Sequence, residues 1–259
     1  MRLSFGRKFG VFYASLVYLF LYLPISILIL YSFNRSKLNA VWTGFTTDWY
    51  VRLFHNDSIL EAAKTSLTVA VITTIGATMI GTLAAVGMYR YHFRGKIALE
   101  GLVFLPIVIP EIVMGISMLA LFSQLKVSLG IMTLLAAHIT FSVPFVMVVV
   151  RARLAGFDKN IEEAAMDLGA KPWTTFLKVT LPVIAPGVIA GALLTFTLSI
   201  DDVVISFFVA GPGSTTLPLK IYSMVKFGVT PEINALSTLM LLATLLIVLF
   251  AERLQQKEK

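Results

Sequence analysis

The stretch VSLGIMTLLAAHITFSVPFVMVVV, residues Val127–Val150, contains no aspartate, glutamate, lysine or arginine over 24 consecutive positions. A helix of about 20 apolar residues is long enough to cross the hydrocarbon core of a bilayer. A surface helix of a soluble protein would show a polar face at a period of about 3.6 residues, and this stretch shows none. It therefore predicts a transmembrane helix.

Five similar runs lie before and after this stretch. Four have no charged residue and the last has one, and they are Phe9–Asn34, Thr65–Tyr89, Val179–Ile200, Ile233–Ala251, and Gly101–Leu125 with Glu111. Only 14% of the 259 residues are charged, whereas about a quarter are charged in an ordinary soluble domain. We therefore expect an all-α integral membrane protein with six transmembrane helices.

Two further features bear on the number of spans. A seventh apolar run, Val203–Leu219, is broken by Gly211-Pro212-Gly213, which favours a partial, re-entrant or interfacial segment over a full span. The first run is longer than the apolar region of a signal peptide, about 7–15 residues, and no small-x-small cleavage site follows it. We interpret it as a retained span.

The basic residues are distributed unevenly between the loops. With six spans, both chain ends lie on one side of the membrane, and the loops of that side carry 14 lysines and arginines against seven on the other. The positive-inside rule then places both termini in the cytoplasm. This asymmetry largely explains the net charge of +7, so no nucleic-acid partner is expected.

The composition also limits the chemistry of the chain. It has no cysteine, which excludes thiolate metal sites and cysteine nucleophiles. The three histidines, His55, His92 and His138, lie far apart in sequence, and no G-x-x-x-x-G-K-[ST] phosphate-binding loop is present. We therefore expect no metal, no cofactor and no ATP hydrolysis or other enzymatic activity by this chain.

Two loops on the outer side have recognisable content. Arg35–Glu61 is rich in aromatic residues, and within it Thr47–Leu53 is predicted to form a short helix on the membrane. Asp201–Glu232 contains Leu217–Lys226, whose apolar residues recur at helical spacing. The first loop is interpreted as an interfacial anchor. The second is either a partner-docking helix or a solvated connector.

The cytoplasmic stretch Arg151–Pro182 predicts two short helices joined by a sharp turn. Asn160 and Glu163 have the spacing of a capping box at the start of the first helix. Gly169 suits the position just after its end. Pro172 suits the first turn of the second helix, and Leu181-Pro182 is expected to end it.

Glu163-Ala164-Ala165, followed by Gly169 and by Val179-x-Leu181-Pro182, resembles the EAA loop of ABC-importer permeases. Val179 stands where that pattern has isoleucine. In that family the loop docks into a cleft of a cytoplasmic ATPase subunit. The resemblance implies that Glu163 meets a basic group of the ATPase and that Gly169 permits the turn. The alternative for Glu163 is that it only caps its own helix.

Nearly the whole chain is similar to the spermidine/putrescine permeases of this family. The similar segments include Gly44–Thr47, Tyr89–Tyr91, Phe93–Lys96, Leu198–Val204 and Leu217–Met224. The resemblance implies a type I ABC-importer permease fold with a cytoplasmic coupling helix, in the bacterial cytoplasmic membrane. It divides the chain into an N-terminal span with its external segment (1–61), the permease core (62–251) and a cytoplasmic tail (252–259).

The same resemblance implies several partners. They are a sister permease in a heterodimer, cytoplasmic ATP-binding subunits, an extracytoplasmic solute-binding protein, and a polyamine as substrate. A permease for another small cation is the alternative within the class. A secondary transporter or channel is the alternative from another class, although it would need no EAA loop, and many such proteins carry an internal repeat that this sequence does not clearly show.

Three carboxylates near or within the spans are candidates for a substrate pathway. Glu111 lies near the middle of the third span, where a charge costs about 2.5–3.5 kcal/mol on insertion scales. Pro106 and Pro110 are expected to kink or open that helix. A cation pathway would use such an acid, whereas a protonated or lysine-paired structural acid is the alternative.

Asp201 and Asp202 end the fifth run, close to the outer side. One is expected to face the pathway and the other to cap the next segment, and Asp202 is favoured for the pathway. Aromatic rings could add cation–π contacts to a polyamine, and the candidates are Tyr18, Tyr22, Phe141 and Tyr222. Packing is the alternative role for these rings. His138 and Ser142, one turn apart in the fourth span, could line the same path, but hydrogen bonds between helices are favoured for them.

Overall fold

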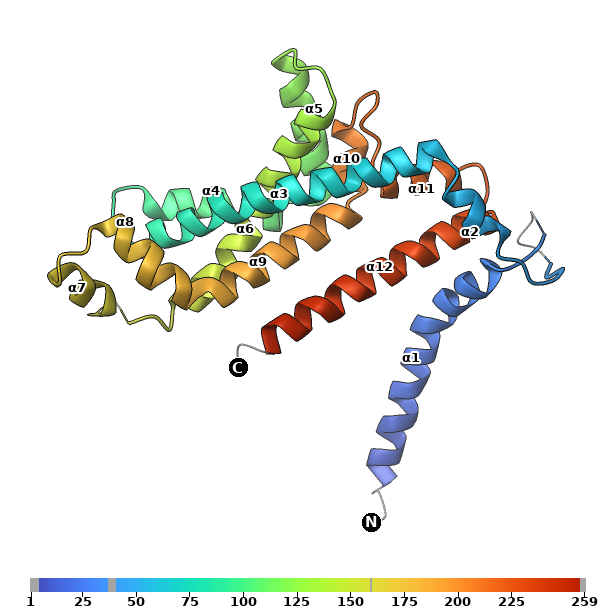
Figure 1. Cartoon of the computed structure of the whole chain (residues 1–259), viewed down its shortest axis with the longest axis horizontal. Helices are drawn as coiled ribbons and strands as arrows, with labels where there is room; N and C mark the ends of the chain where they lie inside the picture. Colours follow the sequence, from blue (N-terminus) through green and yellow to red (C-terminus); the bar gives the residue numbers. More distant parts are fainter. Residues whose placement is uncertain (1–4, 37–40, 159, 257–259) are drawn as a thin grey trace. The chain divides into compact units, whose positions relative to one another are not determined.

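The computed structural model describes residues 5–36, 41–158 and 160–256. This part of the chain is helical, and it contains a single isolated β-bridge, between Asn34 and Phe45, instead of strands. The elements, drawn in Figure 1, are α1 (Phe5–Tyr31), α2 (Asp48–Leu53), α3 (Asp57–Arg90), α4 (Lys96–Val108), α5 (Glu111–Gln124), α6 (Ile131–Leu154), α7 (Asn160–Asp167), α8 (Pro172–Thr175), the π-helical turn η1 (Phe176–Thr180), α9 (Leu181–Asp201), α10 (Val204–Val209), α11 (Leu217–Val225) and α12 (Pro231–Gln256).

Four helical segments are long and apolar enough to cross a membrane. They are Phe9–Tyr31, Asp57–Arg90, Ile131–Leu154 and Pro172–Asp201. The pair α4 and α5 makes a fifth if it counts as one broken span. In α12 the apolar part of the described residues is the shorter segment Pro231–Leu246. The chain is thus an all-helical, multi-pass membrane protein with four to five candidate spans, and the expected count of six stays a prediction.

The third predicted span is broken at its prolines, as the sequence analysis expected. The chain bends by 112° between α4 and α5. Ile109 between them is extended, with φ −72° and ψ 133°, because the ring of a following proline disfavours the helical conformation. Glu111 therefore lies in the first turn of α5, at the break, instead of inside a continuous helix.

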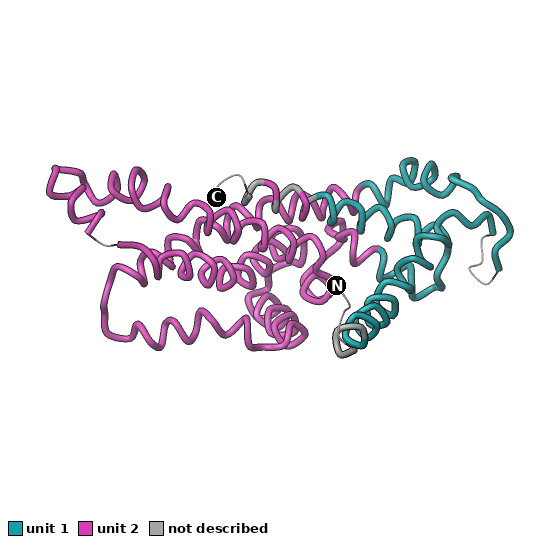
Figure 2. The backbone as a smooth tube through the Cα atoms, turned by 90° about the horizontal axis from the view of Figure 1, so that it is seen from below, with its two compact units in different colours: residues 1–60, 221–247 teal, residues 61–220, 248–259 magenta. Residues whose placement is uncertain are grey.

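The structure divides into two compact units, which Figure 2 colours separately. One comprises residues 1–60 and 221–247, and the other comprises residues 61–220 and 248–259. Within the first unit, the predicted helix near Thr47 forms as α2. Trp49 of α2 is buried and donates its indole N–H to the carbonyl of Asn34 at 2.7 Å, so this ring serves packing within the unit.

The core of the second unit forms where α3, α6 and α9 pack together. Val146 of α6 lies at its centre, and glycines on both neighbouring helices contact it. A Cβ on Gly81 of α3 would lie 2.7 Å from the Val146 Cβ, and one on Gly191 of α9 would lie 3.3 Å from its Cγ1. Glycine thus allows the three helices to approach closely, as in many membrane helix bundles.

The start of α9 differs from the expectation. Leu181-Pro182 does not end the second helix, because α8, η1 and α9 run on as one helical segment from Pro172 to Asp201. The wide turn η1 precedes Pro182, and the Leu181 N–H bonds back five residues to the Phe176 carbonyl. A proline in the first turn after such a π-helical turn removes no regular hydrogen bond, so the helix continues.

Candidate functional site

The segment with the EAA pattern forms a helix and a tight turn. α7 begins at Asn160, whose N–H donates to Asp158 Oδ1 at 3.0 Å. Asp158 therefore supplies the capping oxygen, and the prediction of Asn160 as the capping residue is wrong. Glu163 and Ala164 are exposed and Ala165 is half-buried.

Gly169 ends α7 as predicted. Its φ is +89°, a left-handed conformation that L side chains rarely adopt. Its N–H bonds to the Met166 carbonyl at 2.9 Å, and the Ala170 N–H bonds to the Ala165 carbonyl at 3.1 Å. This pair of bonds is the Schellman motif, which satisfies the last carbonyls of a helix. The backbone conformation, and not crowding, is what requires glycine here. A Cβ at this position would meet no atom within 4 Å.

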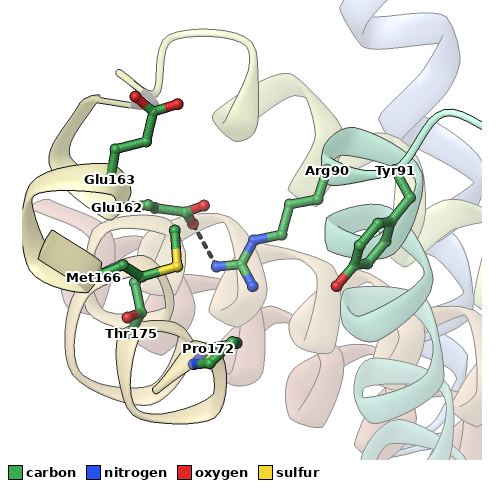
Figure 3. Close-up of a pocket in the computed structure, with 7 residues that line it drawn as sticks. All are labelled: Arg90, Tyr91, Glu162, Glu163, Met166, Pro172 and Thr175. Carbon is green, nitrogen blue, oxygen red and sulfur yellow. Dashed lines mark hydrogen bonds and ion pairs between the residues drawn. The ribbon is translucent and has the colours of Figure 1, made fainter. Parts of the chain in front are cut away.

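Glu162, the residue before the EAA pattern, is the buried member of α7. Its Oε1 accepts a charge-assisted hydrogen bond from Arg90 Nη2 at 2.5 Å, and it also accepts one from the Thr180 hydroxyl. Arg90 Nη2 lies 2.8 Å from the same hydroxyl oxygen. Figure 3 shows that Glu162 points toward Arg90, whereas Glu163 points away from it. Two adjacent glutamates thus point in different directions from one helix.

A cleft of about 330 Å³ lies beside this cluster. The residues shown in Figure 3 line it, and they come from the end of α3 and from α7 and α8. Trp173 of α8 and Leu168 after α7 are exposed nearby, and Leu168 is 91% accessible. An exposed apolar surface beside a polar cleft is typical of a protein-docking surface.

The candidate pathway residues lie in separate places. Glu111 is exposed at the start of α5, where a negative charge interacts favourably with the helix dipole. Among the described residues, no basic side chain forms an ion pair with it. Tyr222 belongs to the other compact unit, and its ring carries the ammonium of Lys226 at 4.7 Å from the centroid.

Asp202 caps α10, and Asp201 does not. The Asp202 carboxylate accepts from the N–H groups of Ile205 at 3.2 Å and Ser206 at 2.7 Å. Asp201 is exposed at the end of α9. The prediction that Asp201 caps the next segment is therefore wrong. Asp202 caps it instead, because the backbone is extended at Asp202 and directs its carboxylate toward α10.

His138 connects three elements around this cap. Its Nδ1 lies 2.8 Å from Ser199 Oγ of α9, and its Nε2 lies 3.1 Å from Ser206 Oγ and 3.4 Å from Asp202 Oδ2. The predicted helix-to-helix hydrogen bonding of His138 is confirmed. The same prediction is wrong for Ser142, one turn along α6, because its buried hydroxyl has no hydrogen-bond partner among the described residues.

The sequence alone did not predict the cluster of Arg90, Glu162 and Thr180. An arginine at the end of a predicted span looks like a topology signal, and a glutamate beside the EAA pattern looks like a solvent-facing residue. The available signal was the helical register, because neighbouring residues on a helix point about 100° apart and cannot both face the same partner.

The comparisons with known proteins agree with this architecture. Residues 77–257 match the family described as binding-protein-dependent transport system inner membrane component. The chain belongs to this family. It is therefore a membrane transport permease and not itself the ATPase.

Two curated relatives align with most of the chain. It is 51% identical to the spermidine/putrescine transport system permease protein PotC of Escherichia coli over 247 residues, 95% of this chain and 94% of the relative. It is 47% identical to the putrescine transport system permease protein PotI of Escherichia coli over 229 residues, 86% of this chain and 82% of that relative.

Solved structures show the same fold at low sequence identity. A bacterial ABC transporter that imports the acidic polysaccharide alginate has a chain with TM-score 0.75 at 18% identity, covering 96% of this permease and 95% of that chain. The MetNI methionine ABC transporter has a chain with TM-score 0.62 at 17% identity, covering 83% of this permease and all of that chain. The ABC-permease fold thus accommodates chemically unlike substrates.

Proposed function

We propose that this permease is a membrane subunit of an ATP-driven importer that moves polyamines such as spermidine and putrescine across the bacterial cytoplasmic membrane. The observation that carries the proposal is the 51% identity with a spermidine/putrescine permease over 95% of the chain. The exposed carboxylates Glu111 and Asp201 fit a cationic substrate, because acids at membrane depth mark cation pathways.

The permease works as part of a larger assembly in this proposal. It pairs with a sister permease, sits on cytoplasmic ATP-binding subunits and receives substrate from an extracytoplasmic solute-binding protein. Its six spans place both termini in the cytoplasm. The type I permease core occupies residues 62–251, between the N-terminal region 1–61 and the tail 252–259.

α7 is the coupling helix in this assembly. Glu163, Ala164 and the turn at Gly169 form the face that docks into the ATPase, and Ala165 packs beneath them. Leu181 and Pro182 are the first residues of α9 and follow the docking segment in the same continuous helix. The exposure of Glu163 and Leu168 supports this role, because both side chains are available to a partner.

The substrate path in this proposal passes Glu111 at the break between α4 and α5. Asp201 supplies a second carboxylate and Tyr222 an aromatic face. Asp202 takes part through the cap that fixes the chain after Asp201. The broken helix supports this path, because interrupted helices in transporters commonly lie beside the substrate.

Uptake by the reconstituted importer tests the substrate. The four components are placed in lipid vesicles, and ATP-dependent uptake of labelled putrescine is measured against unlabelled diamines and polyamines of graded length. Spermidine and putrescine should compete, whereas neutral sugars and acidic amino acids should not. Uptake that is independent of ATP, or insensitive to polyamines, would contradict the proposal.

Single-cysteine labelling tests the topology. Because the chain has no cysteine, Phe54→Cys in the loop after α2 and Leu168→Cys after α7 each give one reactive site. An impermeant thiol reagent applied to intact cells expressing the permease alone should label only the first. Labelling of both sites from outside would refute the six-span arrangement.

A further inference from the structure

Three segments that lie far apart in sequence meet at one carboxylate. Arg90 is the last residue of α3, Glu162 lies in α7, and Thr180 is the last residue of η1 before α9. Both the guanidinium and the hydroxyl donate to Glu162 Oε1. One atom of α7 therefore holds the ends of two long helices.

This attachment is polar, although it lies among buried groups. Glu162 is 7% exposed and is the only buried residue of α7. An eight-residue helix without buried apolar side chains gains little from packing and is marginal alone. α7 also contacts α8 and η1 and its Ala165 is half-buried, but Glu162 is its one buried side chain, so we expect the bonds of Glu162 to fix much of its position against the end of α3.

The strength of these bonds suits a mechanical connection. Removing one partner of a buried ion pair leaves an uncompensated charge, so the pair resists separation. A flexible apolar contact would slide, whereas a short hydrogen-bonded ion pair has a fixed geometry. Thr180 also ends a π-helical turn, a feature that is frequent at functional positions in helices.

We propose that Arg90, Glu162 and Thr180 form the joint that passes a displacement of α7 to α3 and α9. Glu162 is a positioning residue that acts through Arg90 and Thr180, while its neighbour Glu163 faces the ATPase. The inference rests on the proposed docking role of α7 and adds the route by which docking moves the spans. A permease with a broken joint binds and activates its ATPase but translocates poorly.

The decisive measurement is the amount of substrate transported per ATP hydrolysed by the complete importer in lipid vesicles. Glu162→Gln retains the size of the side chain and one oxygen for Thr180 but removes the charge. We expect the ATPase subunit to co-purify and to hydrolyse ATP at a normal rate, while labelled putrescine transported per ATP falls by about tenfold, a loss of about 1.4 kcal/mol in coupling.

Restoring the pair separates a joint from a general folding effect. Arg90→Glu alone should abolish transport, and Arg90→Glu combined with Glu162→Arg should recover a substantial part of it. Arg90→Lys keeps the charge and should retain most transport. The matched control is the ion pair Arg151–Glu100 at 3.3 Å, which connects α6 to α4 without contacting α7, and Glu100→Gln should leave transport per ATP unchanged.

The outcomes distinguish this joint from the docking role. Normal transport per ATP in Glu162→Gln would overturn the joint. If Glu162→Gln lost both ATPase binding and transport, and the exchanged pair recovered neither, Glu162 would be a folding or docking residue. That result would also overturn the proposed joint. Unchanged ATPase binding in Glu163→Arg and Gly169→Val would instead refute docking through α7.

Discussion

The two ends of the helical segment from Pro172 to Asp201 each carry a polar cluster that holds neighbouring helices, but the clusters differ in kind. At the η1 end, the carboxylate of Glu162 faces the guanidinium of Arg90. At the other end, His138 shares its two nitrogens between serine hydroxyls and Asp202, whose carboxylate mainly caps α10. Each cluster joins three elements around the same segment.

The clusters also differ in the exposure of the group that faces the carboxylate. The Arg90 side chain is 19% exposed, whereas that of His138 is 2% exposed. The two carboxylates are almost equally buried, with side-chain exposures of 9% for Glu162 and 8% for Asp202, so each is costly to leave unpaired. The His138 cluster therefore braces helices within the bundle, whereas the Glu162 cluster attaches the short helix α7 and would move with it as one unit.

The largest effect is expected at Gly169, beside the first cluster. Gly169→Val places a β-branched residue in a left-handed conformation, which costs more than the 1–2 kcal/mol of an ordinary L residue. The permease should remain in the membrane but lose ATPase association and uptake. Gly169→Asn, which tolerates this conformation, is the control and should retain function. Full uptake by the valine variant would contradict the turn's role.

A tenfold effect is expected at Glu111, on the side of the second cluster. Glu111→Gln keeps the shape and deletes the charge that the polyamine would meet, so uptake at limiting substrate should fall by about tenfold or more. Glu111→Asp retracts the charge by one methylene and should keep partial activity. Equal expression with normal uptake by Glu111→Gln would remove this residue from the pathway.

The brace itself is tested at His138. His138→Ala leaves two serine hydroxyls and Asp202 short of a partner, and should lower the free energy of unfolding by about 3 kcal/mol. Thermal unfolding of the detergent-solubilised permease measures this change. Ser142→Ala is the control, because its buried hydroxyl has no partner among the described residues and its loss should be nearly neutral. Equal effects of the two variants would refute the brace.

The smallest effect distinguishes the two aspartates. Asp202→Asn retains one acceptor oxygen for the cap and should cost about 1 kcal/mol of stability or less, with uptake changed little. Asp201→Asn should leave stability unchanged and raise the polyamine concentration needed for half-maximal uptake. The opposite result would restore Asp202 as the pathway residue, as the sequence analysis favoured.

Local patterns predicted several features that the structure contains. The break at Pro110, the turn at Gly169 and the short helices near Thr47 and Leu217 depend on residues close in sequence. The continuation of the helix through Leu181-Pro182 was missed, because a π-helical turn has no simple sequence signature. Asn160 was predicted to cap α7, but Asp158 does so. Both residue types are good caps and they lie two positions apart.

The sequence by itself determined that the chain is a helical membrane protein with the motif of an ABC-importer permease. Absence of charge over a membrane thickness, and the spacing of Glu163, Gly169 and Pro182, are properties of the chain alone. Only the tertiary structure decided that Glu162 meets Arg90 and Thr180, and that His138 of α6 lies beside Asp202. Those contacts join residues between 18 and 90 positions apart, and helix packing sets such pairs without leaving a periodic signal in the sequence.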